Sequence, residues 1–173
     1  MKVLVGFATA AGSTEGVAQR IAGTMRGHGH EVETRNVDEV SDVHGYDAFV
    51  LGSAVHNQAW LPNAAGFLSR ERQALARKPV WLFSVGLPGA LRGPVRKWAG
   101  MEESDILAGL ADDVRPLGHQ LFTGVVTPRA FGRGGAVVFR LMGGRFGDFR
   151  DWAAIDVWAN QIAEDLTDTE TLG

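Results

Sequence analysis

A run of small and hydroxyl-bearing residues, directly after the first apolar segment, is the part of the chain best suited to bind a ligand. Its members are Thr9, Ala10, Ala11, Gly12, Ser13 and Thr14. Apolar side chains then recur every three to four residues over 17–25, which predicts a helix that begins at the run. Free N–H groups and the positive end of the helix dipole meet there, and they favour an oxygen-rich anion such as a phosphate monoester. The hydroxyls add donors, and Gly12 lets the backbone approach closely.

This loop contains no Lys or Arg. A phosphate held without a cation suggests the monoester of a bound cofactor rather than a transferable triphosphate. The alternative is a helix capped by Ser13 or Thr14 with no ligand. The loop lacks the Gly-Lys-Ser/Thr of a Walker A motif and the acidic residues of a phospho-acceptor domain, and the glycines at 132–135 do not complete a dinucleotide fingerprint. These three kinds of site are therefore excluded.

Two further loops carry candidate binding residues, one after an apolar segment at 47–52 and one after an apolar segment at 79–85. The candidates are Ser53, Ala54, Val55, His56, Asn57, Trp60, Ser84, Val85, Gly86, Leu87 and Gly89. Trp60 offers a planar face for stacking on a ring. Its alternative role is a hydrophobic staple before a helix that opens at Pro62. His56 is equally well explained as a solvated loop residue, and the histidines lack the spacing of metal ligands.

Strand-like and helix-like segments alternate along the whole chain. The predicted strands cover about 2–8, 30–37, 47–52, 79–85 and 120–126, and the predicted helices cover about 14–28, 62–75, 104–113 and 151–166. This alternation predicts an α/β fold with a doubly wound, five-stranded parallel sheet in the order 2-1-3-4-5. The three loops then share the carboxyl edge of the sheet, where such folds bind ligands. We expect one domain over 1–167 and a disordered tail over 168–173.

Composition narrows the function further. The chain has 173 residues, 45% of them hydrophobic, which is enough for one domain with a sizeable core. It has no cysteine, so disulfides, thiolate metal sites and dithiol redox chemistry are excluded. A formal charge of −3 gives no indication of nucleic-acid binding. The first apolar run is short and is explained as a strand, so we expect a cytoplasmic protein with no export signal and no membrane span.

The first loop closely resembles the phosphate loop of flavodoxins, whose common pattern is T-x-T-G-x-T-E. The residues in register with that pattern are Thr9, Gly12, Thr14 and Glu15. Ala11 stands where the pattern has a threonine, and Ser13 replaces a frequent asparagine. The resemblance covers essentially the whole chain and implies a flavodoxin-like fold with one bound FMN. It also implies that the loops beginning at Ser53 and Ser84 clamp the isoalloxazine ring.

A segment at 128–150 follows the fifth predicted strand as an insertion. It combines one acidic residue, Asp148, with eight large apolar residues and five arginines, Arg129, Arg133, Arg140, Arg145 and Arg150. This mixture predicts a basic amphipathic surface for an anionic or membrane-associated partner. The alternative is an ordinary extra helix with solvated arginines. We expect any membrane contact to be peripheral, at the inner face.

The order of elements most resembles the bacterial menaquinone-dependent protoporphyrinogen dehydrogenases. The matching features are the turn 52–55, the segment 83–85, and an insertion that leads to Asp151-Trp152. The resemblance implies an FMN-dependent oxidoreductase that moves electrons from a small organic donor, with a porphyrinogen as one candidate, to a quinone-type acceptor. The alternative function is a flavodoxin-type carrier between protein partners. No catalytic residue and no oligomeric state follow from the sequence.

The loop at 53–60 contains no glycine. In flavodoxins that transfer single electrons, a peptide of this loop turns over when the flavin is reduced, and a glycine makes the turn inexpensive. The resemblance therefore implies mainly two-electron reduction here, which suits dehydrogenation better than single-electron shuttling.

Overall fold

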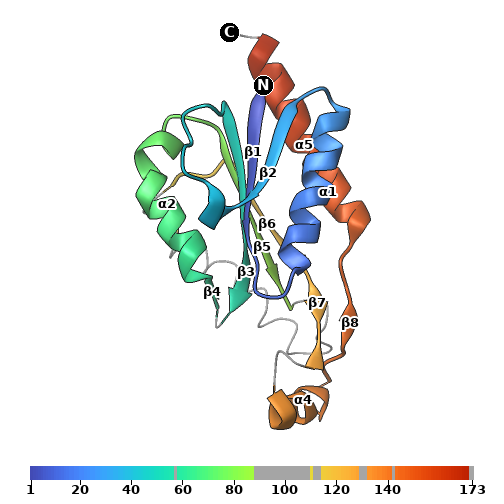
Figure 1. The fold of residues 1–173 in the computed structure, drawn as a ribbon. Helices are drawn as coiled ribbons and strands as arrows, with labels where there is room; N and C mark the ends of the chain where they lie inside the picture. Colours follow the sequence, from blue (N-terminus) through green and yellow to red (C-terminus); the bar gives the residue numbers. More distant parts are fainter. Residues whose placement is uncertain (57, 88–109, 111–113, 129–131, 142, 172–173) are drawn as a thin grey trace.

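A central parallel sheet, flanked by helices on both faces, organises the protein in a computed structural model (Figure 1). The structure describes residues 1–56, 58–87, 110, 114–128, 132–141 and 143–171. The strands of the sheet are β1 (Lys2–Ala8), β2 (Glu31–Asn36), β3 (Ala48–His56), β5 (Val80–Gly86) and β6 (Gly118–Thr123). They pair in the order β2-β1-β3-β5-β6, all parallel. The predicted doubly wound order 2-1-3-4-5 is confirmed.

The helices cover the two faces of this sheet separately. They are α1 (Ser13–Gly27), α2 (Pro62–Leu75) and α5 (Trp152–Thr171), with a short 3-10 turn η1 (Val37–Glu39) after β2. Figure 1 shows α1 and α5 together on one face and α2 on the other. Because both faces are covered, β1 is buried from Val3 to Ala8. Pro62 opens α2 at its first turn, as the sequence predicted.

Each face of the sheet has its own apolar core. Successive side chains of β1 point into different cores. Val5 packs in the core with α1 and α5, whereas Leu4 packs in the core with α2. Trp158 of α5 packs against Phe83 of β5 with ring centroids 6.2 Å apart. Gly52 of β3 is paired with Phe83 in the sheet, and a Cβ at Gly52 would overlap the Phe83 ring, so only glycine fits there. An ion pair fixes α1 to α5.

That ion pair joins Arg20 and Asp156. The guanidinium Nε and Nη2 donate to the two carboxylate oxygens, each at 2.6 Å. The arginine holds the pKa of the Asp156 carboxyl below its usual range. Because α1 begins at the candidate phosphate loop, this pair helps to fix the direction in which the helix N-terminus points.

Two strands end elsewhere than the sequence predicts, and one predicted helix is not covered by the described residues. β3 runs on to His56, because it turns into a hairpin with β4 (Ala59–Trp60) that pairs Val55 with Trp60. The fifth strand is shifted and ends at Thr123, and residues 125–126 of the predicted strand belong to a second, two-stranded sheet. The expected helix at 104–113 lies outside the described residues except for Leu110, which is helical.

The expectation of a disordered tail from residue 168 is wrong for 168–171, which continue α5. Two threonines support the extra turn, since Thr167 and Thr169 donate their hydroxyl hydrogens to the carbonyls of Ala163 and Asp165, each at 2.8 Å. No glycine or proline interrupts the helix before Gly173. Residues 172–173 lie outside the described part of the chain.

The insertion forms a small unit of its own after β6. Its elements are β7 (Val125–Val126), α4 (Gly132–Leu141) and β8 (Gly147–Asp148), and β7 and β8 pair antiparallel. Figure 1 shows this unit projecting from the end of the sheet where β1 leads into α1. Within the part of the chain that the structure describes, no helix is long and apolar enough to cross a membrane.

Candidate functional site

The candidate phosphate loop connects β1 to α1 at the carboxyl edge of the sheet. Gly12 adopts a left-handed conformation with φ of 86°, which glycine accepts without strain. Its N–H donates to Thr9 Oγ1 at 2.8 Å, and its carbonyl accepts the first helical hydrogen bond, from Gly16 N. Thr9 therefore closes the loop from within. Ala10, Ala11 and Gly12 are exposed around it.

The start of α1 has no side-chain cap. Gly12 occupies the cap position and no side-chain hydrogen bond satisfies the first N–H groups of the helix. The alternative in which Ser13 or Thr14 caps a ligand-free helix is therefore not what the structure contains. Uncapped N–H groups at the positive end of the dipole remain available to an anion.

Thr14 supplies the most direct indication of a ligand. The residue is 0% exposed, and its Oγ1 is the one buried side-chain oxygen or nitrogen in the described residues with no hydrogen-bond partner. Burying an unsatisfied hydroxyl costs about 1–3 kcal/mol. A phosphate oxygen over the loop would accept this hydrogen and remove the cost. The loop thus fits a phosphate monoester in both its backbone and its side chains.

The space beside the loop is kept open by Gly124, which connects β6 to the insertion. A Cβ on Gly124 would lie 3.0 Å from Ser13 Oγ and 2.8 Å from Val85 Cγ1, so a side chain there would press on two of the predicted site residues. The Gly124 carbonyl accepts from Phe149 N at 3.3 Å. The predicted phosphate loop, the loop after β5 and the insertion consequently meet at this point.

The parallel register brings the three predicted loops together. Ala8 pairs with Ser53, and Ser53 pairs with Ser84, at the ends of β1, β3 and β5. Ser53 Oγ accepts from Leu61 N at 3.0 Å and donates to the Ala54 carbonyl at 2.9 Å. Both serines are buried. We infer that their hydroxyls hold the loops in shape.

The side chain of Trp60 is positioned by a hydrogen bond to a residue of β5. Its indole N–H donates to Ser84 Oγ at 2.8 Å, and that oxygen lies 2.9 Å from His119 Nε2 of β6. The ring is 6% exposed and belongs to the core under α2. This packing resembles the alternative role of a staple before α2, and stacking of Trp60 on a flavin stays a prediction. Sequence reasoning missed His119, because nothing local relates it to a residue 35 positions away.

The remaining predicted site residues line the rims of the two loops. Ala54, Val55 and Gly86 are half-buried, His56 and Leu87 are exposed, and Val85 is buried. Asn57 and Gly89 lie outside the described residues. Next to Asn57, Gln58 has a left-handed backbone with φ of 62° at the turn of the β3–β4 hairpin. A residue with a Cβ is strained there by about 1 kcal/mol or more.

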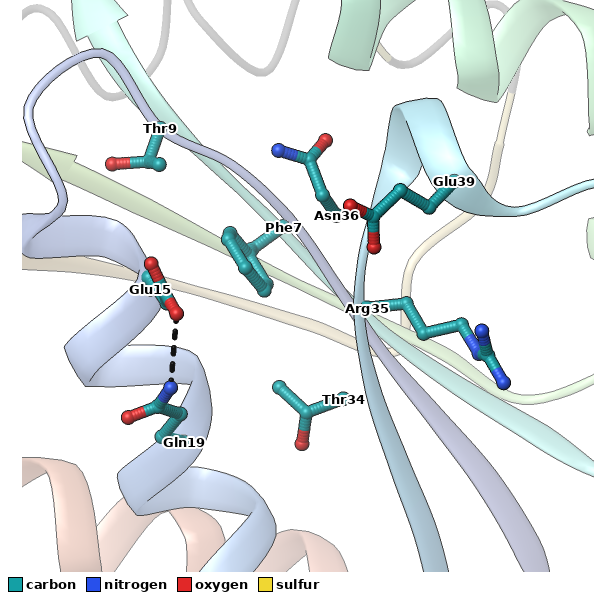
Figure 2. A pocket seen from close by; sticks show the side chains of 8 residues that line it. All are labelled: Phe7, Thr9, Glu15, Gln19, Thr34, Arg35, Asn36 and Glu39. Atoms are coloured by element: carbon teal, nitrogen blue, oxygen red, sulfur yellow. Dashed lines mark hydrogen bonds between the residues drawn. The ribbon is translucent and has the colours of Figure 1, made fainter.

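The opposite side of the phosphate loop is acidic. A pocket of about 270 Å³ lies between α1 and β2, and Figure 2 shows Glu15 on its α1 side and Glu39 beside Asn36 on the other side. Glu15 accepts a hydrogen bond from Gln19, and Arg35 turns away to Glu33. Two carboxylates repel a phosphate dianion. We therefore expect a bound phosphate on the side of the loop that faces β3 and β5.

Arg150 is the cation that sequence reasoning did not connect with the loop. Its guanidinium packs against Gly16 in the first turns of α1, lies 4.5 Å above the Trp152 ring, and bonds Asp148 through Nε and Nη2. Asp148 holds the pKa of Arg150 above its usual value. A Cβ at Gly16 would displace the guanidinium, and this requirement for glycine is the only trace of the contact in the sequence.

No group of three His, Asp or Glu side chains that could hold a metal ion occurs within the described ranges. The site consists of an anion-binding loop, two neighbouring strand-end loops and a bordering insertion. Such a site can hold a phosphorylated organic cofactor against the edge of the sheet.

Residues 4–132 match the family described as the flavodoxin domain. No curated protein sequence matches the chain. Among solved structures, a short-chain flavodoxin associated with a non-canonical PDU bacterial microcompartment has a TM-score of 0.63 at 14% identity, with 98% of each chain covered. A flavodoxin from the domain Archaea has a TM-score of 0.59 at 16% identity, with 96% of this chain and 99% of that chain covered.

A larger protein contains the same fold. The rubredoxin oxygen:oxidoreductase of Desulfovibrio gigas matches with a TM-score of 0.60 at 20% identity. The comparison covers 96% of this chain but 36% of that protein. At these identities the structural likeness establishes the fold, and the family match identifies the cofactor. FMN is the cofactor of this flavodoxin-like domain, as the sequence predicted.

Proposed function

We propose, because this chain belongs to the flavodoxin domain family, that it is an electron-transfer protein that carries electrons between protein partners on one bound FMN. The single observation that carries the proposal is Thr14, whose buried hydroxyl lacks a partner at the uncapped start of α1. Two flavodoxins that match over nearly their full length support the carrier function. When bound, FMN supplies reversible one- and two-electron chemistry.

Different residues of the chain bind the phosphate of the cofactor and position the loops around its ring. The N–H groups at 13–15 and the Thr14 hydroxyl bind the phosphate, and the carboxylates of Glu15 and Glu39 direct it toward β3. Ser53 and Ser84 fix the loops that flank the ring. The exposed rim at His56 and Leu87 leaves an edge of the site open to a partner.

The carrier function is tested by the number of electrons accepted in each step. The FMN-loaded protein is photoreduced stepwise while the fraction of molecules with an unpaired electron is measured by electron spin resonance and absorbance. A carrier of single electrons accumulates this species in most molecules at half reduction. A yield below about a tenth would overturn the carrier function and leave the second candidate.

The second candidate is an FMN-dependent dehydrogenase that passes electrons in pairs from a small organic donor to a quinone. Gln58 favours it, because a strained non-glycine residue occupies the hairpin turn where carriers profit from a glycine. The resemblance to protoporphyrinogen dehydrogenases makes a porphyrinogen the donor to assay. Quinone-dependent appearance of porphyrin fluorescence, absent without the protein, supports this candidate, and the lack of any quinone-dependent turnover contradicts it.

A further inference from the structure

One face of α4 is apolar and exposed. Val137, Val138 and Leu141 are 59%, 55% and 82% exposed, and their spacing of three and four residues places them on one side of the helix. Phe139 points the opposite way and is buried. A soluble domain gains nothing from three exposed aliphatic side chains on one helical face, so this face is suited to contact another apolar surface.

The buried side of α4 anchors the helix to the insertion. Phe139 packs with Val126 of β7 and with Phe146, whose ring centroid is 5.4 Å away. Gly144 is needed under it, because a Cβ there would overlap the Phe139 ring. The amphipathic helix is therefore held by its inner side, and its outer face is not the result of a loose or unfolded segment.

Two exposed arginines of the same unit lie over aromatic rings of its inner cluster. Arg140 lies 5.7 Å from the centre of the Phe146 ring, and Arg145 lies 5.1 Å from that of Phe149. The acidic residue of the unit, Asp148, is bonded to Arg150, so their charges offset each other. The described part of the insertion thus keeps a positive balance within a chain whose formal charge is −3.

We propose that α4 docks this domain on an anionic phospholipid surface, with Val137, Val138 and Leu141 among the acyl chains and Arg140 and Arg145 at the headgroups. An amphipathic helix with this division of residues binds at the bilayer interface. A ten-residue helix is about 15 Å long, and three aliphatic side chains fall short of the roughly 800 Å² per partner of a standard protein interface. A lipid surface needs no such minimum. The proposal does not depend on which of the two functions is correct.

The position of α4 gives the docking a consequence. The insertion projects from the carboxyl edge of the sheet (Figure 1), and Gly124, directly before it in the chain, lies against Ser13 of the phosphate loop. Docking would therefore hold the FMN edge of the domain beside the bilayer rather than away from it.

The test is sedimentation of the FMN-loaded protein with phosphatidylcholine vesicles that contain either no or 40% phosphatidylglycerol. We expect binding to the anionic vesicles alone, reduced at 0.5 M salt. The double variant Arg140→Gln with Arg145→Gln should weaken binding about 25-fold, or about fivefold for each arginine. Val138→Asp with Leu141→Asp should abolish it while bound FMN is retained, which shows that the domain is folded.

Val157→Asp is the matched control, because Val157 is 58% exposed on α5, outside the insertion. This variant should bind vesicles like the wild type. Equal binding of wild-type protein to neutral and anionic vesicles, or no binding to either, would overturn the proposal. So would a wild-type dimer in analytical ultracentrifugation that Val138→Asp with Leu141→Asp dissociates, because a second copy would then cover this face.

Discussion

Replacing Thr14 with valine should raise the stability of the apoprotein and lower its affinity for FMN. Valine keeps the shape of the side chain and removes only the hydroxyl. In the structure that hydroxyl is fully buried and lacks a partner, so its removal relieves a cost of about 1–3 kcal/mol in the apoprotein. The free energy of unfolding of the apoprotein rises by that amount.

The same hydroxyl is assigned to the phosphate of FMN. A hydrogen bond to a charged group contributes about 1.5–3 kcal/mol. Since about 1.4 kcal/mol is a factor of ten, the dissociation constant for FMN should rise about 10- to 150-fold. The melting temperature of the apoprotein should rise by about 2–4 °C for each kcal/mol in a chain of this size.

Two assays measure the two effects. Quenching of flavin fluorescence gives the affinity for FMN, and thermal unfolding without FMN gives the stability. Thr169→Val is the control, since Thr169 is exposed on α5 and its hydroxyl donates to the backbone carbonyl of Asp165. Unchanged FMN affinity in Thr14→Val, or a less stable apoprotein, would refute the assignment of Thr14 to the phosphate.

Three other substitutions test separate parts of the account. Gly52→Ala should lower the melting temperature by several degrees in a thermal scan, because the added Cβ overlaps the Phe83 ring, and an unchanged value would contradict that packing. Tyr46→Phe removes the hydrogen bond that contributes most to lowering the pKa of Glu33 to about 2, so it should reduce stability at pH 7 by about 1 kcal/mol, an effect that fades as the pH falls from 4.5 to 2 in urea titrations. A loss that persists at pH 2 would contradict it. Gln58→Gly should raise the yield of unpaired electron on half reduction, measured by electron spin resonance, and a lower yield would argue against strain at this turn.

The sequence predicted the parts of the site whose signals are local. β1, the loop at 9–14 and α1 form one continuous stretch, and its apolar spacing and hydroxyls define both the elements and the ligand. The parallel order then follows from the alternation of strands and helices. Ser53 and Ser84 could be grouped with the loop because carboxyl ends of parallel strands share an edge.

The contacts that sequence reasoning missed join residues far apart in the chain. Trp60 could be expected to face a ring or to pack before α2, and only the position of Ser84 decides where its indole N–H points. Arg150 reaches Gly16 because β8 returns along the insertion to α1. The end of α5 was placed too early, because threonines with low helix propensity carry the last turn by bonding backbone carbonyls.

The central claim is that the phosphate of FMN is bound by the loop from Thr9 to Thr14. Its most direct test is to titrate the apoprotein with FMN and with riboflavin, which has the same ring and ribityl chain but no phosphate, and to compare the two dissociation constants by fluorescence. The account predicts one FMN per chain and riboflavin binding at least about 100-fold weaker, since the phosphate accepts several charge-assisted hydrogen bonds. Equal affinity for the two flavins would contradict it.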